Sequence, residues 1–134
     1  MRIKVYLAGQ ADEYENNWKK KFGDIGVCDF HDWEIHSDQT SPDTYFPDDL
    51  SGVKNSEYLI ANPGVVSSEG TWIEVGAFYA YKTKSPGEFC DSLIIIWSEN
   101  RNPKWSLDFV KKTGHVVLTV EEAKEKLLEL LSKR

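Results

Sequence analysis

Apolar residues along the chain gather in five short runs, and the segments between them have helical or polar character. Short apolar runs bounded by glycine, proline or polar residues are typical of strands buried in a sheet. The run SLIIIW is the most hydrophobic, so we expect it to form a central strand covered on both faces. The predicted strands cover residues 3–9, 25–30, 57–64, 92–97 and 115–119.

Helical spacing is visible in most of the segments between these runs. Tyr14, Trp18 and Phe22 recur at i, i+4 and i+8, which places them on one face of a helix. Pro47 and the acidic residues after it open another helix, whereas the polar and aromatic residues 31–46 predict a long loop. A loop of that length in a compact domain is usually functional or mobile. The predicted helices cover residues 12–23, 47–56, 71–82, 106–114 and 120–134.

The alternation of strands and helices predicts an α/β fold built on a five-stranded parallel sheet. The expected architecture is a flavodoxin-like or Rossmann-like three-layer α/β/α sandwich, formed as one domain by residues 1–134. In such sheets ligands bind beyond the carboxyl ends of the strands. Three segments are expected to open on that edge: Ala8–Gln10 after the first strand, Asn62–Thr71 after the third and Ser98–Pro103 after the fourth.

The net charge of −6 argues against a protein that binds nucleic-acid polymers, because such proteins usually carry a basic face. The one basic cluster, Lys19–Lys21, is expected to be a solvated helix face. The net charge does not exclude a small nucleoside or nucleotide as ligand. His31, Asp32 and His36 are too loosely spaced to predict a metal site, and we expect neither a metal nor a cofactor.

Cys28 and Cys90 match no metal or redox spacing and lie near apolar segments, so we expect buried free thiols in a reducing cytoplasm. The apolar stretch at the N-terminus is too short for a signal peptide, and no segment approaches a membrane span. The sequence therefore predicts a cytoplasmic protein that does not enter a membrane.

Glu74 in the stretch SSEGTWIEVG has two interpretations. Thr71 and Glu74 have the spacing of a capping box, in which the threonine caps a helix and the glutamate bonds back. The same pattern recurs at Thr119 and Glu122, where only a structural role is expected. Glu74 also falls at the predicted ligand-binding edge, so its carboxylate is a candidate reactive group.

Three segments in order, VYLAGQ, DLSGVKNSEYLIAN and EGTWIEVGAFYAYKTK, decide how we interpret Glu74. Neither a Walker loop nor a GxGxxG motif accompanies them. Together they resemble the nucleoside 2-deoxyribosyltransferase family over roughly residues 2–100. The residues that match the motifs of the family are Tyr6, Asp49 and Glu74, and the glutamate helix is the most specific part of the match.

The resemblance implies a retaining double displacement at C1′ of a 2′-deoxyribonucleoside, without a cofactor. Glu74 would be the nucleophile that forms a covalent deoxyribosyl ester, Asp49 would contact or protonate the base, and Tyr6 would orient Glu74. A second nucleobase would then capture the sugar. The expected partners are deoxynucleosides and free nucleobases, and the family implies a homo-oligomer of two or more subunits.

Sugar recognition departs from the family pattern, because Ser68 stands where many members carry an aspartate. The predicted substrate-binding residues are Gly9, Gln10, Ser68, Glu69, Gly70 and Asn102. A serine at this position is also found in N-glycosidases that act on 2′-deoxynucleoside 5′-monophosphates, although the acidic segment GQADEYENN is poor for binding phosphate. A hydrolase acting on such a nucleotide or on another N-riboside, and a non-catalytic nucleotide-binding module, therefore stay open as alternatives.

Overall fold

A computed structural model describes residues 2–10, 17–65, 68–99 and 105–134. Its five strands are β1 (Ile3–Gly9), β2 (Cys28–Asp32), β3 (Tyr58–Asn62), β4 (Cys90–Ile96) and β5 (Gly114–Val117). They form one parallel sheet in the order β2-β1-β3-β4-β5. All five predicted strands and the parallel sheet are confirmed. The apolar β4 lies inside the sheet, and β3 is the strand at its centre.

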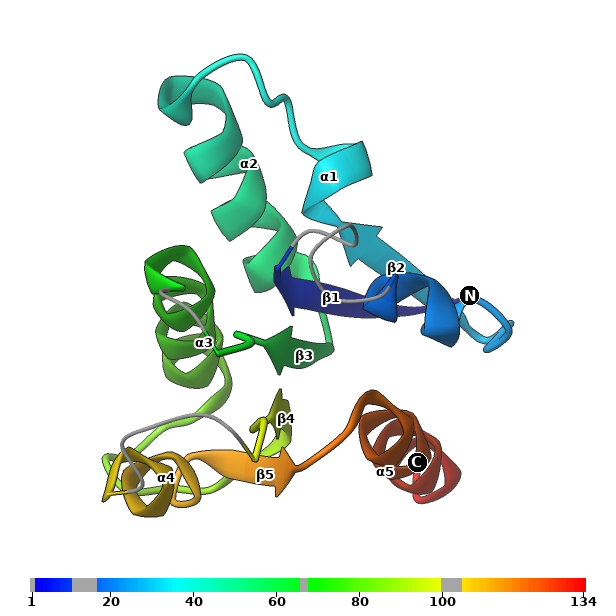
Figure 1. Ribbon diagram of the computed structural model, residues 1–134, viewed down its shortest axis with the longest axis vertical. Coiled ribbons are helices and arrows are strands. Elements are labelled where there is room, and N and C mark those ends of the chain that lie inside the picture. Colours follow the sequence, from blue (N-terminus) through cyan, green and yellow to red (C-terminus); the bar gives the residue numbers. More distant parts are fainter. Residues whose placement is uncertain (1, 11–16, 66–67, 100–104) are drawn as a thin grey trace.

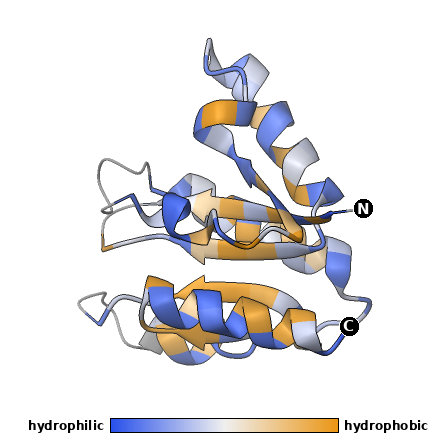
Figure 2. Cartoon of the chain, turned by 90° about the vertical axis from the view of Figure 1, so that its right-hand side faces the viewer, coloured by the Kyte–Doolittle hydropathy of each residue, from blue (hydrophilic) through white to orange (hydrophobic). Residues whose placement is uncertain are grey.

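The helices cover both faces of this sheet and complete a three-layer α/β/α arrangement (Figure 1). They are the 3₁₀ helix η2 (Trp18–Phe22), α1 (Trp33–His36), α2 (Pro42–Asn55), α3 (Glu69–Lys82), α4 (Trp105–Val110) and α5 (Val120–Ser132). Helices α2 and α3 pack together on one face, and α5 packs on the other with η2. Figure 2 shows the hydrophobic strands enclosed between helices of mixed polarity.

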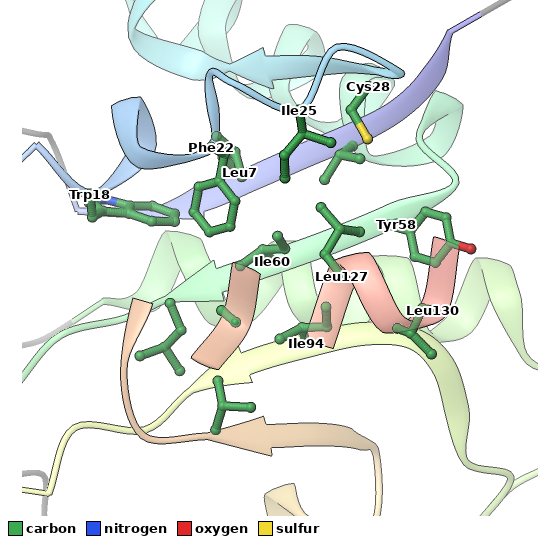
Figure 3. Close-up of a cluster of buried hydrophobic side chains, with 14 residues drawn as sticks. Leu7, Trp18, Phe22, Ile25, Cys28, Tyr58, Ile60, Ile94, Leu127 and Leu130 are labelled. Carbon is green, nitrogen blue, oxygen red and sulfur yellow. The ribbon is translucent and has the colours of Figure 1, made fainter. Parts of the chain in front are cut away.

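Successive side chains of each strand enter different cores, because strand residues alternate between the two faces of a sheet. Leu7, Ile60 and Ile94 pack with η2 and α5 in one core cluster (Figure 3). Tyr6 and Leu59 belong to the opposite cluster, beneath α3. This alternation places the only polar atom of the Tyr6 side chain, its hydroxyl, on the face where α3 carries Glu74.

The segment predicted as a helix over 12–23 differs in the structure. Its described part is a 3₁₀ helix that buries Trp18 and Phe22, while Tyr14 lies outside the described residues. The prediction of a solvated Lys19–Lys21 face is wrong for Lys19, which is 4% exposed. The ammonium group of Lys19 pairs with Asp32 at 2.5 Å and also with Glu34. These two carboxylates replace the water that the buried charge loses.

Helix α2 begins earlier than predicted and reduces the expected loop over 31–46. Ser41 and Thr44 form a reciprocal capping box and Pro42 occupies the first turn, where a proline is tolerated. Pro47 therefore lies within the helix and does not open it. As a consequence Asp49 is the eighth residue of α2 and not a first-turn residue, which carries its side chain along the helix toward α3.

Two further predictions on local structure agree with the fold, whereas the helix predicted over 106–114 ends at Val110. Thr119 caps α5, its hydroxyl accepting a hydrogen bond from the Glu122 amide at 3.1 Å. Cys28 and Cys90 are both buried free thiols. No helix within the described ranges is long and apolar enough to cross a membrane.

Candidate active site

Glu74 is not the capping residue that its spacing from Thr71 suggested. Helix α3 is capped at Ser68 and begins at Glu69, so Glu74 is the sixth residue, one turn beyond the position that a capping box requires. Thr71 lies inside the helix and is buried. The predicted helix start at Thr71, which would place Glu74 in the first turn, is therefore wrong, and the capping explanation for this carboxylate fails.

The carboxylate of Glu74 instead accepts a hydrogen bond from the hydroxyl of Tyr6, a residue distant in sequence on β1. Tyr6 is fully buried and Glu74 is 8% exposed. Phe78, one turn further along α3, packs in the same core cluster as Tyr6 and fixes the helix over the strand. The structure thus brings Tyr6 and Glu74 together, while the orienting role expected for Tyr6 stays a prediction.

Burial raises the pKa of Glu74 to about 7, because desolvation disfavours the charged carboxylate. The hydrogen bond from Tyr6 lowers this pKa, and the nearby charge of Asp49 raises it. Burial and the adjacent carboxylate raise the pKa of Tyr6 far above its usual range, so Tyr6 stays a neutral donor. Glu74 is thus poised to be partly ionised near neutral pH.

A cavity of about 480 Å³ opens beside Glu74, large enough for a nucleoside-sized ligand. Its walls come from α1, α2, the N-terminal turns of α3 and the end of β1. They include three carboxylates and three aromatic side chains. The lining residues are Gly9, Trp33, Gln39, Tyr45, Phe46, Asp49, Leu50, Ser68, Glu69, Gly70, Thr71, Ile73 and Glu74.

Asp49 reaches this cavity from α2 and differs electrostatically from an exposed aspartate. Burial raises its pKa, and the neighbouring charge of Asp48 adds to that effect. The hydroxyl of Ser37 donates a hydrogen bond to Asp49, which acts in the opposite direction. Two carboxyl groups with raised pKa values, Asp49 and Glu74, therefore share one cavity, an arrangement typical of acid–base chemistry.

The N-terminus of α3 forms another wall. Ser68 is the N-cap residue, yet its hydroxyl makes no capping bond. The Ser68 hydroxyl oxygen is buried without a hydrogen-bond partner among the described residues. Buried polar atoms are normally paired, so this oxygen is available to a hydroxyl or anionic oxygen of a ligand.

Gly9 shapes the floor of the cavity. Its φ is 148°, and a Cβ at this position would lie 2.3 Å from the carbonyl oxygen of Asn62. The indole nitrogen of Trp33 donates a hydrogen bond to the Gly9 carbonyl at 3.1 Å, which anchors this aromatic side chain beside the cavity. Gly9 thus allows the ends of β1 and β3 to meet closely under the ligand site.

Most of the predicted site residues meet around this cavity. The cavity is lined by six of them: Gly9, Asp49, Ser68, Glu69, Gly70 and Glu74. Tyr6 does not line it but donates a hydrogen bond to Glu74 from β1. Gln10 does not line it; the side-chain amide of Gln10 donates to the Pro63 carbonyl at 3.2 Å and ties together the ends of β1 and β3. Asn102 lies outside the described residues.

The aromatic walls were not predicted. Trp33, Tyr45 and Phe46 lie in the segment that the sequence indicated only as a functional or mobile loop. A signal was present, because the carboxyl end of β2 opens on the same sheet edge as that of β1 and leads directly into Trp33. Among the described residues no group of three or more His, Cys, Asp or Glu side chains is arranged to hold a metal ion.

Comparison with known proteins identifies the fold and leaves the family open. No family model and no curated protein matches the chain. Among solved structures, the Clostridium botulinum CMP N-glycosidase BcmB is similar, with a TM-score of 0.63 and 24% sequence identity. The match covers 92% of this chain and 97% of BcmB. The chain therefore has the same three-layer fold as BcmB, with a parallel sheet of five strands.

Proposed function

We propose that this protein is an enzyme that cleaves the N-glycosidic bond of a nucleoside or nucleotide through a covalent pentosyl ester on Glu74. The observation that carries the proposal is the environment of Glu74. Its buried carboxylate accepts a hydrogen bond from Tyr6, and Glu74 and Asp49 line the same cavity. The motif resemblance supports the same three residues. The fold shared with a CMP N-glycosidase supports chemistry on the same kind of bond.

In the first step a carboxylate oxygen of Glu74 attacks the anomeric carbon. The bond between C1′ and the base nitrogen breaks, and its electron pair leaves with the base. Asp49, whose pKa is raised by burial, supplies a proton to the departing base. Tyr6 keeps the attacking carboxylate oriented through its hydroxyl. The oxocarbenium-like transition state is stabilised by the adjacent anionic Glu74.

In the second step an acceptor attacks C1′ of the ester, and Glu74 leaves as a carboxylate. Asp49, now ionised, takes the proton that the acceptor releases. Two inversions at C1′ retain the original configuration. Water as acceptor gives hydrolysis, and a second nucleobase gives transfer.

We favour water as the acceptor because the similar structure is an N-glycosidase, whereas the motif resemblance favours transfer to a base. Incubation of a cytosine nucleoside or nucleotide with and without free adenine separates the two. Release of cytosine at equal rates in both reactions supports hydrolysis. An adenine nucleoside or nucleotide formed only when adenine is present supports the transferase.

Two features of the cavity bear on whether the substrate carries a phosphate. The unpartnered Ser68 hydroxyl at the start of α3 suits a phosphate oxygen, as in an N-glycosidase of nucleotides. Asp49, Glu69 and Glu74 in the same cavity oppose a dianion. We expect this opposition to favour a nucleoside, so kcat/KM for deoxycytidine or cytidine should exceed that for the corresponding monophosphate. The reverse order would assign the Ser68 end of the cavity to phosphate.

The homo-oligomer implied by the resemblance stays a prediction.

Tyr6→Phe is expected to move the pH dependence of the reaction. The hydrogen bond from Tyr6 lowers the pKa of Glu74, so its removal raises that pKa above about 7. Because the nucleophile must be ionised, kcat/KM of the wild type for a 4-nitrophenyl pentoside, whose leaving group needs no proton from Asp49, should rise with pH through about 7. The rise for Tyr6→Phe should lie at higher pH. A pH–rate profile of both proteins measures this. An unchanged rising limb, with only a lower plateau, would contradict the role given to Tyr6.

A further inference from the structure

The ring of Tyr6 is held on one side by an imidazole. β1 and β2 are paired so that Tyr6 lies opposite His31, and both side chains are on the same face of the sheet. Their ring centroids are 5.0 Å apart and their planes differ by 15°, which is a stacked arrangement. His31 is therefore the direct neighbour of the residue that bonds to Glu74.

Helix α2 packs against the rings of Tyr6 and His31 at Gly52. A Cβ at Gly52 would lie 2.8 Å from Nε2 of His31 and 3.0 Å from Cε2 of Tyr6. Glycine is among the least favourable residues within a helix, and α2 nevertheless carries one at its point of contact with the two rings. The missing side chain is what allows the helix backbone to pack against the stack.

The position of His31 is not explained by hydrogen bonding through its Nε2 atom. That nitrogen is buried and has no partner in the described part of the chain. Burial and the neighbouring His36 lower the pKa of His31, so its ring stacks in the neutral form. What the ring contributes here is a flat surface against Tyr6.

The surroundings also indicate that the stack limits the movement of Tyr6. A separate cavity of about 310 Å³ is lined by His31, His36, Gly52 and Asp48, among others. Truncation of His31 would join its volume to this cavity and leave the Tyr6 ring unsupported on that side. A buried ring beside empty space loses packing contacts and settles elsewhere.

We propose that His31 and Gly52 are positioning residues, which together fix the Tyr6 ring in the orientation from which its hydroxyl donates to Glu74. Neither residue lines the cavity beside Glu74. The effect of these residues on rate rests on the proposed function, but the orientation of Tyr6 is a separate property that needs no substrate.

The substrate-independent test is an NMR titration of the Glu74 carboxyl carbon in protein labelled with ¹³C-glutamate, assigned by its loss in Glu74→Gln. The groups that act on the pKa of Glu74 are Tyr6 from β1 and Asp49 from α2. Displacing the Tyr6 hydroxyl removes the influence that lowers this pKa. Gly52→Ala and His31→Ala should therefore raise it, as Tyr6→Phe does.

Two variants control for side effects. Gly76→Ala adds the same methyl group to α3 at an exposed position with nothing within 4 Å, so it should leave the pKa of Glu74 unchanged. His31→Phe keeps a flat ring without the imidazole nitrogens and should stay close to wild type. Rescue by phenylalanine but not by alanine separates stacking from any acid–base role of His31.

In kinetic assays Gly52→Ala and His31→Ala should lower kcat roughly tenfold to a hundredfold, with KM within about twofold, since a small misplacement near the chemistry has effects of this size. A folded Gly52→Ala or His31→Ala with the wild-type pKa of Glu74 would overturn the inference. If Gly52→Ala does not fold, His31→Ala decides. A wild type inactive on every nucleoside and nucleotide would contradict the proposed function. The NMR titration would still test the positioning role of His31 and Gly52.

Discussion

Glu74→Gln should abolish turnover and at the same time make the protein more stable at pH 8. The amide is isosteric with the carboxyl group and still accepts the hydrogen bond from Tyr6, so the fold is retained. It has no charge with which to attack C1′ or to stabilise the transition state. Loss of a catalytic nucleophile lowers turnover by several orders of magnitude.

The gain in stability follows from the direction in which the pKa of Glu74 changes on folding. Its folded value, about 7, lies above its ordinary value of 4.5, so the folded state favours the protonated form. The associated stability is fully present below about pH 4.5 and is lost as pH rises through about 7. The change in pKa corresponds to roughly 3 kcal/mol. The glutamine variant does not titrate and loses none of it.

Urea unfolding of both proteins at pH 4 and pH 8 measures this effect. The free energies of unfolding should be similar at pH 4, and that of Glu74→Gln should be higher at pH 8. Glu122→Gln, in the first turn of α5 where the Glu122 carboxylate accepts a hydrogen bond from the Thr119 hydroxyl, is the matched control for a glutamate that does support its helix, and it should give no gain at pH 8. An active Glu74→Gln would contradict the nucleophile assignment, and one destabilised at pH 8 would contradict the raised pKa of Glu74.

Asp49→Asn should lower the rate on natural substrates by roughly 10² to 10⁴, the range for removal of a general acid. The asparagine keeps the size of the side chain and its place beside Ser37. It cannot deliver a proton to a departing base. The expected loss therefore depends on how much protonation the leaving group needs.

Leaving-group dependence gives the decisive measurement for Asp49. With a 4-nitrophenyl pentoside, whose leaving group departs as a stable anion, Asp49→Asn should retain most of the wild-type rate of the first step. Asp48→Asn changes the adjacent acid, which is exposed and does not line the cavity beside Glu74, and should affect neither substrate strongly. Equal losses on both substrates for Asp49→Asn would show that Asp49 binds or orients the sugar and is not the acid.

The sheet was largely predictable because parallel strands buried on both faces leave continuous apolar runs in the sequence. β3 is an example, with all five of its residues buried. The order β2-β1-β3-β4-β5 was not predictable from these runs, since no local pattern records which strands pair. The proximity of Tyr6 and Glu74 was predictable only from the family resemblance.

The errors in the prediction have local physical causes. Thr71 and Glu74 have the spacing of a capping box, but Ser68 starts the helix three residues earlier and carries Glu74 past the cap. Pro47 suggested a helix start, although the Ser41–Pro42 pair upstream is a stronger one. Lys19 was predicted to be solvent-exposed because its partners, Asp32 of β2 and Glu34 of α1, lie in other elements of the chain. Such tertiary pairings override local patterns.

Mass spectrometry of a trapped intermediate tests whether Glu74 forms a covalent pentosyl ester. Intact protein is mixed with a 2′-fluoro arabinonucleoside, whose fluorine slows breakdown of the ester, and the labelled peptide is then mapped. One added pentosyl group is expected, attached at Glu74, and none is expected on Glu74→Gln. Steady release of the base with no adduct, or an adduct on another residue, would contradict it.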